Sequence, residues 1–397
     1  MARQNRDHRE TSIASIMPVD SPISRENHSH TPARAQTPVR PSEVLMIVWA
    51  PQQRRASNMC QTLGFHLRFV NGIRRTGRLK FTTRLWKCVE YVTKFVETIA
   101  ICIARRPRLC IVQNPPFFAI YAAWIGMLLS FRKPRLIADC HNAVFRPPWS
   151  RMTGAHFCLK LCQSILVHNE DIFQMLPRIG FNVPHALVLE TRPTCVAPDD
   201  NSRQFESPVL QSIFAKKDHK TLIAPLAWKD DEPIEELVKL GAELPDFQIL
   251  LTGMKGLRSH LRQNAPPNVI FTGFLSASDY ELAMLRSTLV VGVTTIDGIQ
   301  MSVANEAVGM GRPMVLSGTN TTRKLFYKGA VYTQGHTAKD FSNAVKQALD
   351  SLTTLSADAI SLREERLHRW DLQADRFLQM ANIQTRNVSS VLTTRNK

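Results

Sequence analysis

The chain lacks an apolar run long enough to cross a bilayer. Its longest, FFAIYAAWIGMLLSF at 117–131, has 15 residues, and a spanning helix needs about 20. The first 40 residues lack the apolar core of a secretory signal and are rich in Ser, Pro, Arg and His, which predicts a disordered tail. Glycine is scarce, with 17 against 23 proline in 397 residues. This composition excludes collagen-like and wholly disordered chains and leaves a soluble or peripheral protein of two or three domains.

The sequence also lacks a C-x-x-C pair and any histidine interleaved with cysteine at metal-ligand spacing. Its eight cysteines all lie between positions 60 and 195, most of them within apolar runs such as IAICIA and RLCIV. This placement predicts reduced, buried and inert thiols in a cytosolic protein.

Positive charge is concentrated in one half of the chain. Residues 41–195 contain 21 basic and 7 acidic side chains, a net charge of +14, whereas residues 196–397 contain 23 and 22. So uneven a distribution indicates an anionic partner of the first half, such as phosphate-bearing lipid, a membrane surface or nucleic acid. A solubility charge without a partner is the alternative. Because no helix-turn-helix, zinc or RRM signature is present, we expect no nucleic-acid partner.

The apolar run at 117–131 has two interpretations. It is a buried helix, or it is a helix that rests partly in a membrane interface. The second is supported by Tyr121 and Trp124 within it and by the basic residues Arg132, Lys133 and Arg135 that follow. With the basic series between 74 and 87, it predicts a first domain that docks on anionic lipid without spanning it.

Strand-like and helical segments alternate along most of the sequence. Short apolar runs at 44–50, 67–70, 108–116, 134–142, 164–170 and 186–190 are separated by helical stretches. A second series of six strand–helix steps begins at 220, after a segment at 196–217 rich in Pro, Asp and Ser. The alternation predicts βαβ units and parallel sheets. We therefore expect an α/β protein with a tail at 1–40, Rossmann-like domains at 41–195 and 205–355, and a C-terminal crossing helix and tail at 356–397.

Polar residues at the strand ends are the candidates for chemistry, because ligands of parallel sheets bind where strands end. In the first domain these are Asn114, Asp139, His141, Asn142, His168 and Glu170. In the second, the segment TTIDGIQMSVANEAVGMGRPMVLSG at 294–318 follows a strand, contains Glu306 in a short helix and exits through Gly311 into another strand. An ionised carboxylate such as Glu306 can accept two hydrogen bonds at once, and the amides at a helix start favour an anion.

This second-domain segment resembles the donor-binding signature of the nucleotide-sugar glycosyltransferases of group 1, family-four type, which have the two-domain GT-B fold. IVQNPPFFAIYAAWIGMLLSFRKPRLIADCHNAVF at 111–145 and TLIAPLAWKDDEPIEELVKLGAEL at 221–244 are similar, in the same order, to the β-mannosyltransferases that extend dolichol-linked chitobiose. The resemblance covers roughly 110–320. It implies two domains facing across a cleft, with the C-terminal helix crossing back to the first.

The resemblance also implies roles for individual residues. His141 would hydrogen-bond the sugar or act as a base, with Asp139 as the alternative base. Arg54 and Arg55 replace a glycine-rich first loop and suit a pyrophosphoryl acceptor, while Trp124, Arg132 and Lys133 would face acceptor or membrane. The residues expected to bind the donor are Glu306 at the ribose, Lys255 and Lys229 at a phosphate, and Asp297, Gly298, Ser302 and Asn305 around them.

The sequence departs from the family pattern at position 298, where Gly stands in place of a second glutamate, beside Asp297. It also has no Asp-x-Asp pair after a strand, the usual clamp for a divalent ion, so we expect a metal-independent enzyme without cofactors.

The predicted activity is transfer of a hexose from a nucleotide-diphosphate sugar to a polyprenyl-pyrophosphate-linked saccharide, in polysaccharide or glycoconjugate synthesis. We expect this at the cytoplasmic face of the membrane. The alternatives are a sugar-nucleotide epimerase of the same fold and a catalytically inactive paralogue.

Overall fold

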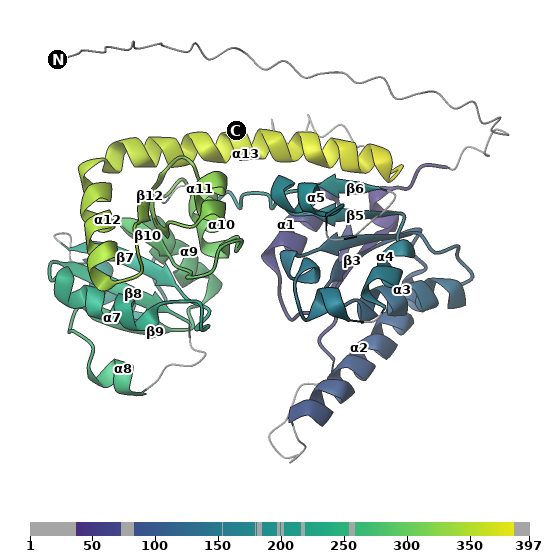
Figure 1. Ribbon diagram of the computed structural model, residues 1–397, viewed down its shortest axis with the longest axis horizontal. Coiled ribbons are helices and arrows are strands. Elements are labelled where there is room, and N and C mark those ends of the chain that lie inside the picture. The colour runs from purple at the N-terminus through teal and green to yellow at the C-terminus, as the bar shows by residue number, and fades with distance from the viewer. Residues whose placement is uncertain are drawn as a thin grey trace, which may run out of the picture. The chain divides into compact units, whose positions relative to one another are not determined.

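The computed structural model describes residues 37–72, 83–152, 154–178, 180, 185–196, 199, 202–215, 219–253 and 259–384 (Figure 1). Most of the expected disordered tail, residues 1–36, lies outside the described residues, as do the basic residues between 74 and 80 and Lys255. Val39 is fully buried and pairs with Ile383 in an isolated parallel bridge, so the expected tail joins the fold before residue 40.

The first half contains a six-stranded parallel sheet in the order β2-β1-β3-β4-β5-β6. Its strands are β1 (Val44–Val48), β2 (His66–Phe69), β3 (Leu109–Asn114), β4 (Leu136–Cys140), β5 (Ser164–Val167) and β6 (Ala186–Val188). The helices between them are α1 (Arg54–Leu63), α2 (Thr83–Arg105), α3 (Phe118–Leu129), α4 (Ala155–Lys160) and α5 (Glu170–Met175), with 3-10 turns η1 (Pro41–Glu43), η2 (Asn142–Phe145) and η3 (Trp149–Arg151).

The second half contains another six-stranded parallel sheet, in the order β12-β11-β10-β7-β8-β9. Its strands are β7 (Lys220–Pro225), β8 (Phe247–Thr252), β9 (Val269–Gly273), β10 (Leu289–Gly292), β11 (Met314–Ser317) and β12 (Ala330–Thr333). The helices are α6 (Pro208–Ala215), α7 (Ile234–Glu243), α8 (Ser259–Gln263), α9 (Ala277–Arg286), α10 (Ser302–Gly309), α11 (Asn320–Leu325), α12 (Ala338–Asp350) and α13 (Leu352–Met380). Two Rossmann-like sheets are thus confirmed.

Both faces of each sheet are covered, which explains why the strands are continuous apolar runs. In β1, Leu45 and Ile47 belong to the core under α3 and α4, whereas Met46 and Val48 belong to the core on the other face. Trp370 and Phe377 of α13 pack into that second core of the first sheet, and Leu355 of the same helix packs with the second sheet. The expected return of the C-terminal helix to the first domain is therefore confirmed.

Two local expectations differ from the structure. The segment at 196–217, expected as the boundary between the two domains, contains a helix, because Pro208 begins α6, and Leu210 and Ile213, three residues apart on one face, are buried. The eight cysteines are free as expected, but Cys88 and Cys195 are exposed rather than buried. Burial raises the pKa of the Cys60 and Cys158 thiols to about 12, which makes those two unreactive. No helix among the described residues is both long and apolar enough to span a bilayer.

Candidate functional site

A buried ion pair stands at the carboxyl edge of the first sheet. Asp139, the second-to-last residue of β4, is fully buried, and Arg55, the second residue of α1, is 6% exposed. Arg55 Nη2 lies 2.8 Å from Asp139 Oδ1, and its Nε lies 3.3 Å from both carboxylate oxygens. Burial by itself would raise the pKa of Asp139, but the charge of Arg55 and the surrounding hydrogen bonds outweigh it and hold the pKa well below its usual value. Asp139 is therefore an ionised carboxylate with its partners already in place.

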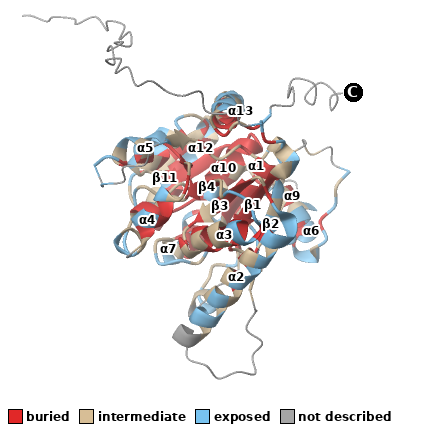
Figure 2. Ribbon diagram, turned by 90° about the vertical axis from the view of Figure 1, so that its right-hand side faces the viewer, coloured by how far each residue is buried: buried red, intermediate tan, exposed pale blue. Residues whose placement is uncertain are grey.

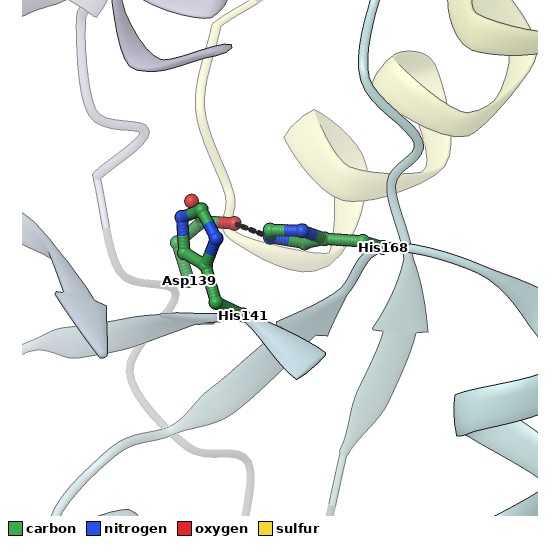
Figure 3. Close-up of side chains that lie close together, drawn as sticks. All are labelled: Asp139, His141 and His168. Atoms are coloured by element: carbon green, nitrogen blue, oxygen red, sulfur yellow. Dashed lines mark hydrogen bonds and ion pairs between the residues drawn. The ribbon is translucent and has the colours of Figure 1, made fainter. Parts of the chain in front are cut away.

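Two histidines complete the cluster (Figure 3). His168, immediately after β5, has Nε2 3.2 Å from Asp139 Oδ1, and its ring centroid lies 4.5 Å from that of His141. Because the ionised carboxylate can only accept, His168 donates through Nε2–H. The sequence placed His168 at a strand end without assigning it a role. The structure places it beside both, with a hydrogen bond to the carboxylate of Asp139 and its ring edge-on to that of His141.

Two glutamines fix the orientation of His141. Gln53 caps the start of α1, where its Oε1 accepts from the Ala56 amide at 2.7 Å, and its Nε2 lies 3.1 Å from His141 Nε2. Gln113 Nε2, from β3, lies 2.5 Å from the same nitrogen. Since the Gln53 amide nitrogen can only donate, His141 Nε2 accepts and the imidazole is protonated at Nδ1. Nδ1–H is then the donor of the His141 ring, and the expected roles of His141 at the sugar or as a base stay predictions.

The histidines are expected to make the fold sensitive to acid. Burial first, and then the neighbouring His168, lower the pKa of His141 from 6.5 to about 3, and burial and Arg55 lower that of His168. Unfolded histidines bind protons below 6.5 that the folded ones do not. The free energy of unfolding should therefore fall as pH drops through this interval, by up to about 1.4 kcal/mol per pH unit for each histidine.

Urea unfolding followed across this pH interval measures the slope. His141→Gln, which keeps a polar side chain between Gln53 and Gln113, should make the slope shallower. An identical slope in wild type and variant would contradict the assignment of the acid sensitivity to His141.

Asp139, His141 and His168 are also the group of potential metal ligands found among the described residues, with ligand atoms within 4.8 Å of one another. A cation on this group would lie beside the guanidinium of Arg55, which already occupies Asp139 Oδ1. Like charges at that separation repel strongly in a buried site. The group of Asp139, His141 and His168 is therefore better suited to hydrogen bonding through its neutral histidines than to binding a metal ion.

Glu306 lies at the carboxyl edge of the second sheet, in α10, and its side chain is 13% exposed. Its Oε1 is 3.0 Å from Nη1 of Arg54 from the first half, and its Oε2 accepts from the hydroxyl of Tyr280 in α9. The Arg54 guanidinium also lies 5.0 Å from the centre of the Tyr280 ring. Burial raises the pKa of Glu306, although Arg54 and the Tyr280 hydroxyl act in the opposite direction. Each carboxylate oxygen thus receives one donor.

The adjacent arginines of α1 serve different sites. Arg55 points into the first sheet at Asp139, whereas Arg54 pairs with Glu306. Each guanidinium therefore has a carboxylate partner. Their expected role at a pyrophosphoryl acceptor remains a prediction, which for Arg54 requires release from Glu306.

The departure at position 298 has a structural counterpart. Gly298 has φ +77°, and a Cβ there would overlap Nη2 of Arg146, which donates to the Gly298 carbonyl at 3.2 Å. Arg146 follows η2 in the first half. Asp297 accepts through Oδ1 from the amide of Gly298 at 2.7 Å and from that of Thr321, in the first turn of α11, at 2.9 Å. These bonds, that of Thr321 foremost, lower the pKa of Asp297 to about 2.

The other expected donor residues lie at the same edge or outside the described part. Ser302 is the exposed first residue of α10, and Lys229 is exposed in the loop after β7. Asn305 is 8% exposed and donates to the Met301 carbonyl at 3.3 Å, so it supports the helix start. Lys255 lies outside the described residues.

The residues expected to face the acceptor or membrane differ in their exposure. Trp124 is half-buried and packs against the core of the first half, while Arg132 and Lys133 are exposed after α3. Tyr121 donates to the Gly154 carbonyl at 3.0 Å. The helix at 117–131 is therefore mostly internal, and its exposed apolar side chains are those at its end, Leu128, Leu129 and Phe131.

Sequence reasoning missed four residues of the site. Tyr280, Arg146, Gln53 and Gln113 are brought in by tertiary packing, and the sequence analysis gave none of them a role, although Gln113 stands in the segment 111–145. Gln53 does cap α1, but glutamine is not among the preferred caps Ser, Thr, Asp, Asn and Gly, so its position before the helix was a weak signal.

No protein-family model matches the chain, and no curated protein matches its sequence. Solved structures do match its fold. The chain aligns with sucrose-phosphate synthase from Thermosynechococcus elongatus with a TM-score of 0.59 and 15% identity, over 85% of this chain and 97% of the other. HepE from Anabaena, solved with UDP and glucose, aligns with a TM-score of 0.60 and 12% identity, over 85% and 99%.

A proposed UDP-N-acetylglucosamine 2-epimerase from Listeria monocytogenes aligns with a TM-score of 0.51 and 12% identity, over 82% of this chain and 91% of the other. At these identities the likeness concerns the fold. The chain has the two-domain GT-B fold that its sequence predicted.

Proposed function

We propose that the chain is a hexosyltransferase that moves a sugar from a nucleotide-diphosphate donor to a lipid-linked saccharide. Glu306 is the observation that carries this proposal. Its two oxygens each accept one donor, from Arg54 and Tyr280, and the 2′- and 3′-hydroxyls of a ribose offer a similar pair of donors. HepE, which has the same fold, was solved with UDP and glucose. In the donor complex the ribose would take the places of these two side chains.

Positive groups near Glu306 suit the diphosphate of the donor. The free amides at the start of α10, beside Ser302, favour an anion. Lys229 is exposed at the same edge of the sheet, and Arg146 occupies the space beside Gly298. We assign the phosphates to these groups, with Arg146 taking the side where the family pattern has a glutamate.

The acceptor is assigned to the first half. Its charge of +14 suits a polyprenyl-pyrophosphate-linked saccharide at the cytoplasmic face of a membrane, with peripheral association. His141 would donate through Nδ1–H to the transferred sugar or the acceptor. Asp139, Arg55 and His168 would position it.

A donor screen tests the proposal. Purified protein is incubated with UDP- and GDP-hexoses, with and without a lipid extract as acceptor, and release of the nucleotide diphosphate is measured. We expect release with one donor that depends on the lipid extract. No release with any pair, together with no nucleotide binding, would contradict the proposal and favour an inactive paralogue.

The same assay tests metal dependence. Because Arg146, Lys229 and the start of α10 supply positive charge, we propose that no divalent ion is needed and expect activity to survive EDTA. Complete loss with the chelator, restored by manganese or magnesium, would show that a metal neutralises the phosphates.

A sugar-nucleotide epimerase is the second candidate, since the fold is shared with a proposed UDP-N-acetylglucosamine 2-epimerase. Such an enzyme needs no lipid acceptor. Conversion of a nucleotide sugar to its epimer in the absence of lipid would favour it.

A further inference from the structure

An arginine-lined pocket lies at the opposite edge of the first sheet from the candidate site. The cavity, of about 280 Å³, is lined by residues at the amino ends of β1 and β2 and in the loops that enter β3 and β4. Four of these residues are arginines: Arg105, Arg106, Arg108 and Arg132. Neither the proposed donor site nor the cluster of Asp139, His141 and His168 lies at this edge.

The pocket carries excess positive charge. Its one carboxylate, Glu43, is already engaged by Arg40 at 3.1 Å and Arg108 at 3.5 Å. Within the described part of the chain, no carboxylate lies within ion-pair distance of Arg105, Arg106 or Arg132. Burial and the nearby charge of Arg108 also lower the pKa of Arg135, the residue that precedes β4. An anion is therefore the ligand that this pocket favours.

An exposed apolar stripe runs along α2 toward the pocket. Val92 and Val96 are 62% and 60% exposed, and Val89 and Ile103 are exposed as well. With 3.6 residues per turn, these four fall on one side of the helix, within about 60° of one another. Figure 2 shows exposed residues along much of α2. Glu97 lies beside the stripe, and its carboxylate accepts from the Gly72 amide at 3.4 Å.

The stripe and the pocket meet at one end of two packed helices. Tyr91 lies near Phe118, and a Cβ at Gly126 would contact Cys102, so α2 and α3 run in the same direction and end side by side. Arg105 ends α2 and lines the pocket. Phe131, 93% exposed, follows α3 and directly precedes Arg132. Apolar side chains thus border the arginines, as the acyl chains of a phospholipid border its phosphate.

We propose that this pocket binds the phosphate of an anionic phospholipid headgroup while the α2 stripe rests in the bilayer interface. The planar guanidinium forks bind phosphate oxygens in pairs, and the valines and isoleucine enter the apolar boundary. The inference rests on the membrane association proposed above and specifies which surface makes it.

Vesicle co-sedimentation of the full chain tests the proposal, with phosphatidylcholine vesicles prepared with or without a minor fraction of phosphatidic acid. Each basic residue near an anionic surface contributes about fivefold to binding, so Arg105→Gln, Arg106→Gln and Arg132→Gln together should lower the partition coefficient on the order of 100-fold. The matched control, Lys339→Gln, Lys346→Gln and Arg376→Gln, removes the same charge from exposed positions on α12 and α13. It should change binding by less than about threefold.

Further variants separate pocket from diffuse charge. Replacing the three arginines with lysine keeps the charge but removes the forks, and should still weaken binding several-fold. Equal binding by this variant and wild type would contradict the assignment of the phosphate to the pocket.

Val92→Ser with Val96→Ser should weaken vesicle binding and make the binding that is left more sensitive to salt. Unchanged binding and salt dependence would contradict the role of the stripe. Displacement of the protein from vesicles by millimolar inorganic phosphate would assign the pocket to soluble phosphate instead.

UDP titration of the same proteins keeps the two proposals apart. We expect every variant to bind UDP as wild type does, which also reports that each is folded. Vesicle binding without UDP binding would leave the docking surface standing and contradict the transferase proposal. UDP binding without vesicle binding would overturn the docking surface alone.

Discussion

Arg55→Met is expected to lower the free energy of unfolding by about 3–5 kcal/mol. The variant leaves the carboxylate of Asp139 fully buried without its ion-pair partner, and breaking a buried pair from one side costs about this much. Since a domain is stable by only about 5–15 kcal/mol, the protein should unfold at a clearly lower urea concentration. Urea titration followed by circular dichroism measures the change.

The neighbouring residue supplies the control. Arg54→Met removes an arginine that is 43% exposed, and its partner Glu306 keeps the hydrogen bond from Tyr280, so this variant should lower the free energy of unfolding by less than Arg55→Met does. The double variant Arg55→Met with Asp139→Asn should recover part of the loss, because no unpaired charge remains buried. A loss of less than about 1 kcal/mol for Arg55→Met alone would show that Asp139 becomes protonated or hydrated at little cost.

The sequence predicted the fold because its signals are local. Apolar runs of four to six residues alternate with amphipathic helices. A strand that is buried on both faces of its sheet is apolar along its whole length, so these runs indicated buried parallel strands. The exception, α6, was hidden by the polar residues that precede Pro208. The helix has eight residues, of which Leu210 and Ile213 are buried and Phe214 is partly buried against the core, so its periodic signal was too short to recognise.

The candidate site was predictable only as far as strand ends reveal it. Asp139 and His141 stand where a parallel strand ends at the edge of its sheet, whereas Glu306 lies inside α10 and was found through the segment at 294–318. Their partners depend on distances along the chain that no periodicity encodes: Arg55 is 84 residues from Asp139, and Tyr280 is 26 from Glu306. Successive residues on a helix point in different directions, so the separate destinations of Arg54 and Arg55 required the structure.

Glu306→Gln is expected to weaken UDP binding at least tenfold. If the carboxylate accepts both ribose hydroxyls, the neutral amide keeps one acceptor and loses a charge-assisted hydrogen bond, which contributes about 1.5–3 kcal/mol. Folding should be unchanged, since the two side chains are nearly equal in shape and Glu306 pairs with a half-exposed Arg54. Calorimetric titration with UDP measures the affinity, and circular dichroism checks the fold.

Tyr280→Phe distinguishes ribose binding from a purely structural role of Glu306. The tyrosine hydroxyl now donates to Oε2 of Glu306, the oxygen that a ribose hydroxyl would need. Removing this competitor frees the acceptor, so UDP should bind as tightly as in wild type or more tightly, in contrast to its weaker binding by Glu306→Gln. Unaltered UDP affinity in Glu306→Gln would show that the carboxylate only joins the two halves through Arg54 and that the ribose is held elsewhere.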